Sequence, residues 1–124
     1  NIDIKTALAV SSNVVFATIG CELGEENLKE IAQRVGLGDS IPFDIPTSKS
    51  SFKYNKMSKA DMAAVGIGQG KLLVTPLHMA LITSAIANDG VMMKPALVSR
   101  IENHNGIVLK KQKPSVCWQQ KMKI

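Results

Sequence analysis

The chain has 124 residues, of which 45% are hydrophobic and 20% are charged. This composition fits one small globular domain and excludes disorder over the whole length. The formal net charge is +5, but the cations are spread from Lys5 to Lys123 and cluster only near the end, as a basic tail. A nucleic-acid reader would interleave aromatics with its cations or present an arginine-rich helix, whereas this chain has two Arg, one Trp and one Tyr, so we expect no nucleic-acid partner.

The two cysteines, Cys21 and Cys117, have no Cys-x-x-Cys spacing and no neighbouring histidine. This argues against a zinc site, and we expect no metal and no cofactor. Two interpretations of the cysteines are possible: Cys21 is a buried free thiol, or it forms a disulfide with Cys117. The apolar runs are too short to span a bilayer, and the first residues lack the pattern of a signal peptide, so any export signal is expected outside this chain.

The first third of the chain predicts three helices. Residues 3–10 form a short one that ends at the polar residues 11–13. In residues 14–24 the apolar and small side chains are too dense for an exposed stripe, so we expect a mostly buried helix that stops at Gly24. Residues 25–35 alternate apolar and charged side chains with helical spacing.

The middle of the chain is predicted to be irregular. Residues 39–57 contain Pro42, Pro46 and several Ser and Thr, which favours a connection without regular structure. Ser58 and Asp61 then have the spacing of a capping box and predict a short helix through Ala64.

A further helix is predicted to begin at Thr75-Pro76, because threonine caps a helix and proline fits its first position. We expect it to reach residue 88 or 89 and to close at Gly90 in a left-handed conformation. Asn105-Gly106 then lies between two apolar stretches and predicts a β-hairpin. The predicted fold class is mainly α with a small β-hairpin.

Three stretches together resemble the transpeptidase domain of penicillin-binding proteins, of the class B type. Residues 7–17 read ALAVSSNVVFA and are similar to that family's Ser-x-Asn motif in a loop between two helices. Residues 67–80 include IGQG and VTPLHMA, and residues 85–90 read AIANDG, which resemble the segment ahead of its third motif. The resemblance covers about residues 3–111 and implies the helical part of the α/β, serine β-lactamase-like fold.

The resemblance implies acyl transfer through a serine, with attack on the D-Ala-D-Ala end of a peptidoglycan stem peptide and covalent binding of β-lactams. By this similarity Ser11 would relay a proton, and Asn13 would offer its amide to the substrate backbone and to the motif lysine. Ser12 is the variable middle position. The parent protein would be membrane-anchored and would act on the outer face of the bacterial cytoplasmic membrane.

The chain departs from the family pattern in three ways. The family's Ser-x-x-Lys nucleophile precedes Ser-x-Asn, whereas here Ser50 and Lys53 follow it in a predicted loop, and Lys-Thr-Gly is absent from the sequence. Residues 114–124 show no family pattern. We therefore expect a partial domain over residues 1–113, a divergent basic tail over 114–124, an inactive chain, and self-association of its uncovered apolar faces.

Other functions remain as alternatives. A penicillin-sensing receptor or a serine β-lactamase would share the same motif chemistry, and a helical binding module would need none of it. His78 lies in a predicted helix with no carboxylate nearby in the sequence, and His104 lies in a predicted turn, so packing or surface roles are favoured over catalysis for both. Gly68 and Gly70 bracket Gln69 without the strand and lysine pattern of a phosphate loop, which favours a tight backbone path over a phosphate site.

Overall fold

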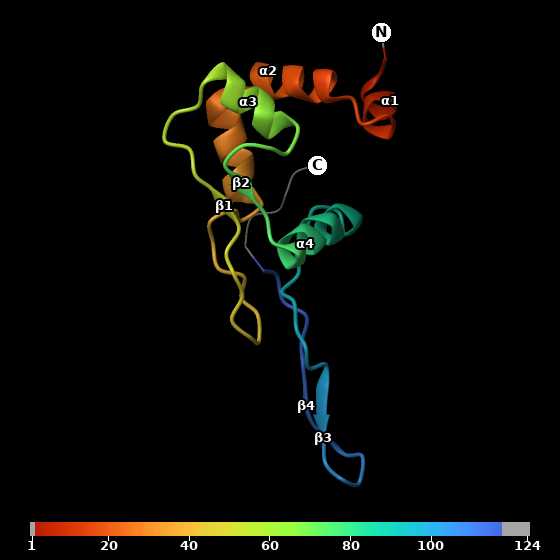
Figure 1. Cartoon of the computed structure of the whole chain (residues 1–124). Helices are drawn as coiled ribbons and strands as arrows, with labels where there is room; N and C mark the ends of the chain where they lie inside the picture. Colours follow the sequence, from red (N-terminus) through yellow and green to blue (C-terminus); the bar gives the residue numbers. More distant parts are fainter. Residues whose placement is uncertain (1, 118–124) are drawn as a thin grey trace.

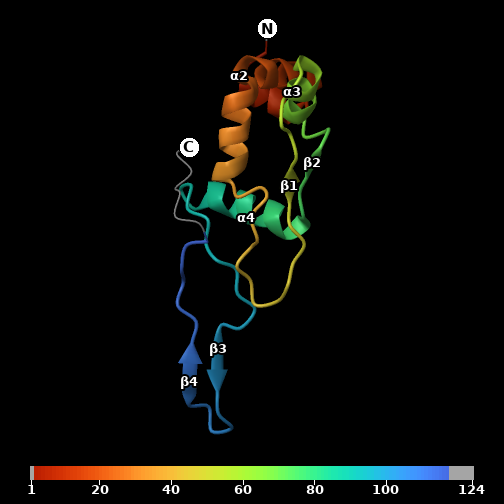
Figure 2. The ribbon, with the colours of Figure 1, turned by 90° about the vertical axis from the view of Figure 1, so that its left-hand side faces the viewer.

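The structure is a computed structural model that describes residues 2–117. Its elements follow in the order α1 (Ile4–Ala9), α2 (Asn13–Arg34), β1 (Ser51–Phe52), α3 (Lys59–Gly66), β2 (Leu72–Leu73), α4 (Pro76–Ala87), β3 (Arg100–Glu102) and β4 (Val108–Lys111). Helices α1 to α3 gather at one end, α4 lies below them, and the β3–β4 hairpin extends from the opposite end (Figures 1 and 2). The mainly helical prediction with one small hairpin is confirmed.

Helix α2 is interrupted at Gly24, where φ is 76° and ψ is 170°. These angles are almost restricted to glycine, so this residue can break the helix where others would be strained. The two helices predicted on either side of Gly24 are confirmed as two halves of α2. After the kink, Glu25 accepts a hydrogen bond from the Met57 backbone N–H at 3.1 Å, and Lys29 donates one to the Asn55 carbonyl at 2.7 Å.

The prediction that residues 14–24 are mostly buried is wrong for this chain. Val14 is 78% exposed, and Gly20 is the one buried residue in this half of α2. The reason is that α3 covers only one side of the helix, so that Val14 and Leu23 stay exposed and Val15, Phe16 and Ile19 are only half-buried.

Helices α2 and α3 cross at a pair of glycines, Gly20 and Gly66. A Cβ added at Gly20 would lie 2.5 Å from the Met62 carbonyl oxygen, and one added at Gly66 would collide with the Phe16 carbonyl oxygen. Only glycine at both positions lets the two backbones approach so closely. Two small cores form around this crossing and around α4. The first contains Leu28, Tyr54 and Met57, and the second contains Ile41, Leu81, Ala85 and Met92.

The predicted caps of α3 and α4 are confirmed. Ser58 and Asp61 form a reciprocal capping box, and the Thr75 hydroxyl accepts a hydrogen bond from the His78 N–H at 3.2 Å. Helix α3 runs on to Gly66, two residues beyond the predicted end. After α4, Gly90 has the predicted positive φ of 79°, but Asp89 before it is also left-handed at 51°.

The connection over residues 39–57 is less irregular than predicted, because β1 lies within it and pairs antiparallel with β2. The hairpin is confirmed: Gly106 has a φ of 77°, and the Asn103 side chain accepts hydrogen bonds from the N–H groups of Asn105 and Ile107. Within residues 2–117, no helix is long and apolar enough to cross a membrane.

Candidate functional site

Ser11 lies in a tight turn between α1 and α2. Its φ is 52°, a left-handed conformation that costs a non-glycine residue about 1–2 kcal/mol. The Ser11 N–H donates to the Leu8 carbonyl at 3.1 Å, and the Ser12 N–H donates to the Ala7 carbonyl at 2.9 Å. This pair of bonds is the Schellman arrangement, in which Ser11 takes the position that glycine usually fills. Backbone hydrogen bonds therefore fix the start of the motif.

The turn is anchored at both ends. Asp3 caps α1, because its carboxylate accepts the Thr6 N–H at 2.6 Å, and this bond lowers the pKa of Asp3. Ala7, fully buried, is the one buried residue of α1. These contacts hold a six-residue helix that would be too short to persist alone.

The two predicted site residues are presented to solvent on the same turn. Ser11 and Asn13 are exposed, whereas Ser12 between them is half-buried and is the N-cap of α2 without a side-chain cap bond. The Ser11 hydroxyl and the Asn13 amide are thus accessible to a group outside this chain. The structure does not test the roles expected for them, and those roles stay predictions.

The misplaced Ser-x-x-Lys at Ser50 and Lys53 does not form a catalytic pair. Ser50 is only 1% exposed, and its hydroxyl accepts the Thr75 N–H at 3.0 Å. Lys53 is exposed. The segment between them is strand β1, where side chains three residues apart point to opposite faces, unlike the same spacing on a helix. The prediction that these residues are not the nucleophile and its lysine agrees with this geometry.

The buried partner of Ser50 is His78. The His78 ring has no exposed surface, with Nδ1 at 2.8 Å from the Ser50 Oγ and Nε2 at 2.7 Å from the Val35 carbonyl oxygen. A carbonyl oxygen only accepts, so Nε2 carries a proton and donates it. In the neutral ring Nδ1 then accepts from the Ser50 hydroxyl. His78 has the predicted packing role, but its two partners were not predicted.

The remaining chemically notable residues form no site. Cys21 and Cys117 are free thiols, so the disulfide is not present, and burial raises the pKa of Cys117. His104 is exposed in the hairpin turn. Among residues 2–117, no group of histidine, cysteine or carboxylate side chains could hold a metal ion.

Gly68 and Gly70 have positive φ angles of 75° and 83°. Gly68 follows α3 in its C-terminal turn, and a Cβ at Gly70 would collide with the Tyr54 hydroxyl. That hydroxyl accepts the Lys71 N–H at 2.7 Å. The two glycines serve a tight backbone path, as predicted.

An apolar groove opens between the two halves of α2 and the β1–β2 pair. It has a volume of about 320 Å³. Its walls include Phe16, Ile19, Leu23, Ile31, Val65 and Leu72. Ile31, on the wall of this groove, is 46% exposed.

The family model for the penicillin-binding protein transpeptidase domain matches residues 1–123. The chain belongs to this family. A relative from Mycolicibacterium smegmatis, the peptidoglycan D,D-transpeptidase PbpA, is 36% identical over 104 residues, which are 82% of this chain and 21% of that protein. Penicillin-binding protein 3 of Bacillus subtilis is 29% identical over 100 residues, which are 80% of this chain and 15% of the relative.

Solved structures agree with this assignment. The crystal structure of PBPA from Mycobacterium tuberculosis matches with a TM-score of 0.84 at 25% identity, over 97% of this chain and 27% of that one. The D,D-transpeptidase domain of an Eggerthella lenta peptidoglycan glycosyltransferase matches with a TM-score of 0.78 at 29% identity, over 98% of this chain and 33% of the other. The chain thus corresponds to the helical part of the transpeptidase fold, as predicted, and spans a third or less of these relatives.

Proposed function

We propose that this chain is the Ser-x-Asn part of a peptidoglycan D,D-transpeptidase, which cross-links stem peptides through an acyl-serine and is acylated by β-lactams. The observation that carries the proposal is the match to the transpeptidase family over residues 1–123, with Ser11 and Asn13 exposed on one turn. Penicillin-binding protein A of M. tuberculosis, which has a TM-score of 0.84 to this chain, has been solved as a penicillin G acyl-enzyme complex.

In the proposed reaction Ser11 is a proton relay. A hydroxyl can accept and donate a proton together, so Ser11 can pass it between a nucleophilic serine, its lysine and the substrate amine. The Asn13 amide has a donor and an acceptor, and it can bind the substrate backbone and the lysine together. The strained turn at Ser11 supports this role, because strain at a non-glycine residue is concentrated at functional sites.

The nucleophile is not among the described contacts of Ser11. Acylation requires a serine activated by a neighbouring base and an oxyanion held by oriented N–H groups. Ser50, which begins the Ser-x-x-Lys pattern of this chain, is buried and hydrogen-bonded to the Thr75 N–H at the start of α4. We therefore infer that this chain forms no covalent adduct with penicillin, although the longer protein does.

Intact-mass measurement after incubation with a labelled penicillin tests this proposal. We expect the mass of the 124-residue chain to stay unchanged and that of a protein with a complete transpeptidase domain around it to increase by one penicillin. Ser11→Ala in the longer protein should slow acylation. An adduct on the short chain that disappears in Ser50→Ala would contradict our assignment of Ser50, and an adduct on Ser11 would make Ser11 the nucleophile.

We also propose that the isolated chain self-associates. The apolar groove with Ile31 and Leu23 on its walls, and the exposed Val14, leave aliphatic surface that a second copy could cover. Sedimentation velocity at increasing concentration should show dimers or larger species. A compact monomer at the highest concentration would contradict the proposal.

Two further expectations stay proposals. The longer protein would be membrane-anchored and would act on stem peptides outside the cytoplasmic membrane, as expected of bacterial cell-wall enzymes. A boundary at residue 113, with a divergent tail after it, also remains a proposal. Within the tail, Val116 still pairs with Met93, and residues 118–124 lie outside the described residues.

A further inference from the structure

The β3–β4 hairpin projects away from helices α1 to α3 in both views (Figures 1 and 2). Every residue of its two strands is exposed. The hairpin and its base also expose six large aliphatic side chains, namely Leu97, Val98, Ile101, Ile107, Val108 and Leu109. A two-stranded hairpin is marginal in water without an apolar partner, and this many exposed aliphatic side chains on one short segment mark a candidate interaction site.

The same segment is strongly cationic. Between residues 97 and 113 there is a single carboxylate, Glu102, against four cations. These cations are Arg100, Lys110, Lys111 and Lys113. The surface therefore combines aliphatic contact area with positive charge, which selects for a partner that carries both aliphatic and acidic side chains.

The strand register places two cations against each other. Arg100 and Lys111 are direct cross-strand partners, as are Ile101 and Lys110. Like charges in directly opposed positions destabilise a strand pair. Glu102 offsets part of this, since its carboxylate lies 2.6 Å from the Arg100 Nε. An acidic side chain placed between Arg100 and Lys111 would relieve the remaining repulsion.

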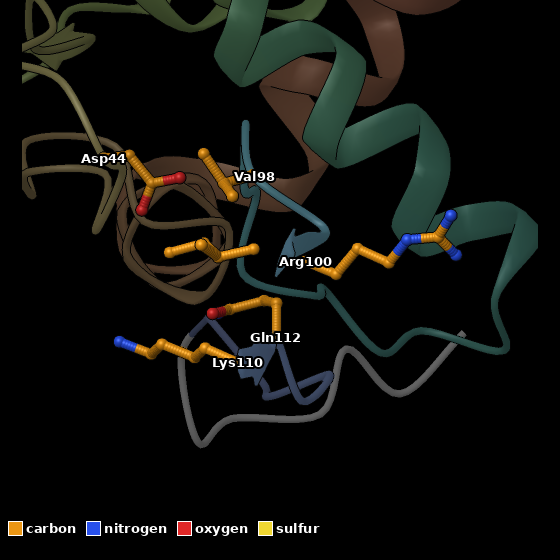
Figure 3. Close-up of a pocket in the computed structure, with 6 residues that line it drawn as sticks. Asp44, Val98, Arg100, Lys110 and Gln112 are labelled. Carbon is orange, nitrogen blue, oxygen red and sulfur yellow. The ribbon is translucent and has the colours of Figure 1, made fainter. Parts of the chain in front are cut away.

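A shallow cleft of about 170 Å³ lies where the hairpin joins the body. Figure 3 shows Asp44 and Val98 on one side and Lys110 and Gln112 on the other, while the Arg100 side chain extends away. The Asp44 carboxylate already accepts a hydrogen bond of 2.8 Å from the Leu97 N–H. The cleft is large enough for one aliphatic side chain, with Lys110 available to a carboxylate beside it.

We propose that the β3–β4 hairpin is a docking surface for an acidic, aliphatic-rich extended segment of a partner protein. A second copy of this chain fits poorly, because pairing two hairpins would place the cations of one copy next to the same cations of the other. Lysines on an edge strand oppose such pairing. A membrane fits poorly as well, because insertion by the tip would bury Asn103, His104 and Asn105. A segment that alternates valine and glutamate has the matching chemistry and the strand period.

The test uses fluorescein-labelled ten-residue peptides and the chain at concentrations below self-association. A peptide of alternating valine and glutamate should bind saturably, with amide shifts confined to β3, β4 and the cleft in NMR spectra. Peptides that alternate valine with lysine, or serine with glutamate, should bind at least about fivefold more weakly, because each retains only half of the complementarity.

Matched variants distinguish binding at the hairpin from general electrostatic attraction between the peptide and the basic chain. Arg100→Gln with Lys111→Gln should weaken binding roughly fivefold, whereas Lys49→Gln with Lys53→Gln, an equal loss of exposed charge elsewhere, should not. Leu109→Ser should weaken binding at unchanged charge. Equal effects of both charge pairs, or no effect of Leu109→Ser, would overturn the proposal.

Two further outcomes would also overturn it. Tighter binding to phosphatidylglycerol vesicles than to the valine-glutamate peptide would mean that the hairpin meets a lipid surface. Peptide binding by this chain that is absent in a protein with the complete transpeptidase domain would mean that another part of the same polypeptide covers the hairpin.

Discussion

The His78 ring joins two segments that are 43 residues apart, because its Nε2 donates a hydrogen bond of 2.7 Å to the Val35 carbonyl. Val35 is the C-cap of α2 and His78 lies in the first turn of α4. Through Nδ1 the same ring reaches Ser50, next to β1. One buried side chain thus connects a helix end, a helix start and a strand.

We predict that His78→Phe lowers the free energy of unfolding by about 2–4 kcal/mol. Phenylalanine fills similar space, but the Val35 carbonyl then loses its donor and the Ser50 hydroxyl loses the acceptor for its proton, at about 1–3 kcal/mol for each group. Urea unfolding followed by circular dichroism measures the change. Ser50→Ala should cost about 1–3 kcal/mol, while Ser48→Ala, at an exposed serine, should cost almost nothing. Equal midpoints for the two serine variants would contradict the network.

Gly20→Ala should destabilise the chain by about 1–3 kcal/mol, because the added methyl would lie 2.5 Å from the Met62 carbonyl and force α2 and α3 apart. The sign is diagnostic, since the same change in a free helix stabilises it by about 1 kcal/mol. Thermal unfolding of Gly20→Ala and of Glu22→Ala, on an exposed face of the same helix, measures the difference. A stabilised Gly20→Ala would show that the helices do not cross at this point.

Ser11→Gly should stabilise the chain by about 1 kcal/mol, because glycine adopts a φ of 52° without the penalty that serine bears. The matched control is Ser12→Gly, where φ is −73° and the added backbone freedom should destabilise. Differential scanning calorimetry compares the two. In the longer protein, Ser11→Gly should raise the melting temperature and slow acylation together, so a stable variant with full activity would contradict the relay.

Acid should weaken the start of α3. The Ser58 side chain, followed by its backbone N–H, lowers the pKa of Asp61 below 3.8 by hydrogen bonding to the carboxylate. Because the folded pKa is depressed, this contribution to stability is present above the unfolded pKa and is lost as pH falls through the folded one. Asp61→Asn should therefore flatten the fall in stability below about pH 4. Unfolding midpoints between pH 2 and 6 test this, with Asp39→Asn, outside any helix cap, as the control.

Much of the fold could be predicted because its signals are local. Thr75-Pro76, the box at Ser58 and the Asn105-Gly106 turn act through neighbours within about four residues. The β1–β2 pair escaped prediction because each strand has two residues, and Ser51 pairs with Leu73 across a long connection. The burial of residues 14–24 was overestimated. A high density of apolar side chains predicts that a helix is covered, but it does not tell which other segment covers it.

The candidate site also has features that local sequence predicts and features that it does not. The identities of Ser11 and Asn13 follow from a motif of adjacent residues. The left-handed turn at Ser11 was missed because serine seldom takes that conformation, although a polar residue just after a helix, where glycine is usual, was a signal for it. The Ser50–His78 contact spans 28 residues and left no mark in local sequence.

The Schellman turn at Ser11 has a consequence for how the motif can be moved between proteins. Its hydrogen bonds join backbone atoms of residues 7–12, so its shape depends on no side chain from elsewhere in the chain. The stretch from Asp3 to Asn13 contains the cap and the backbone hydrogen bonds that shape the turn, and it needs from its host only an apolar surface on which Ala7 is buried. Reactivity is different in kind, since the base and the nucleophile must come from other segments. Evolution or design could exchange the presenting turn as a unit, but could not transfer catalysis with it.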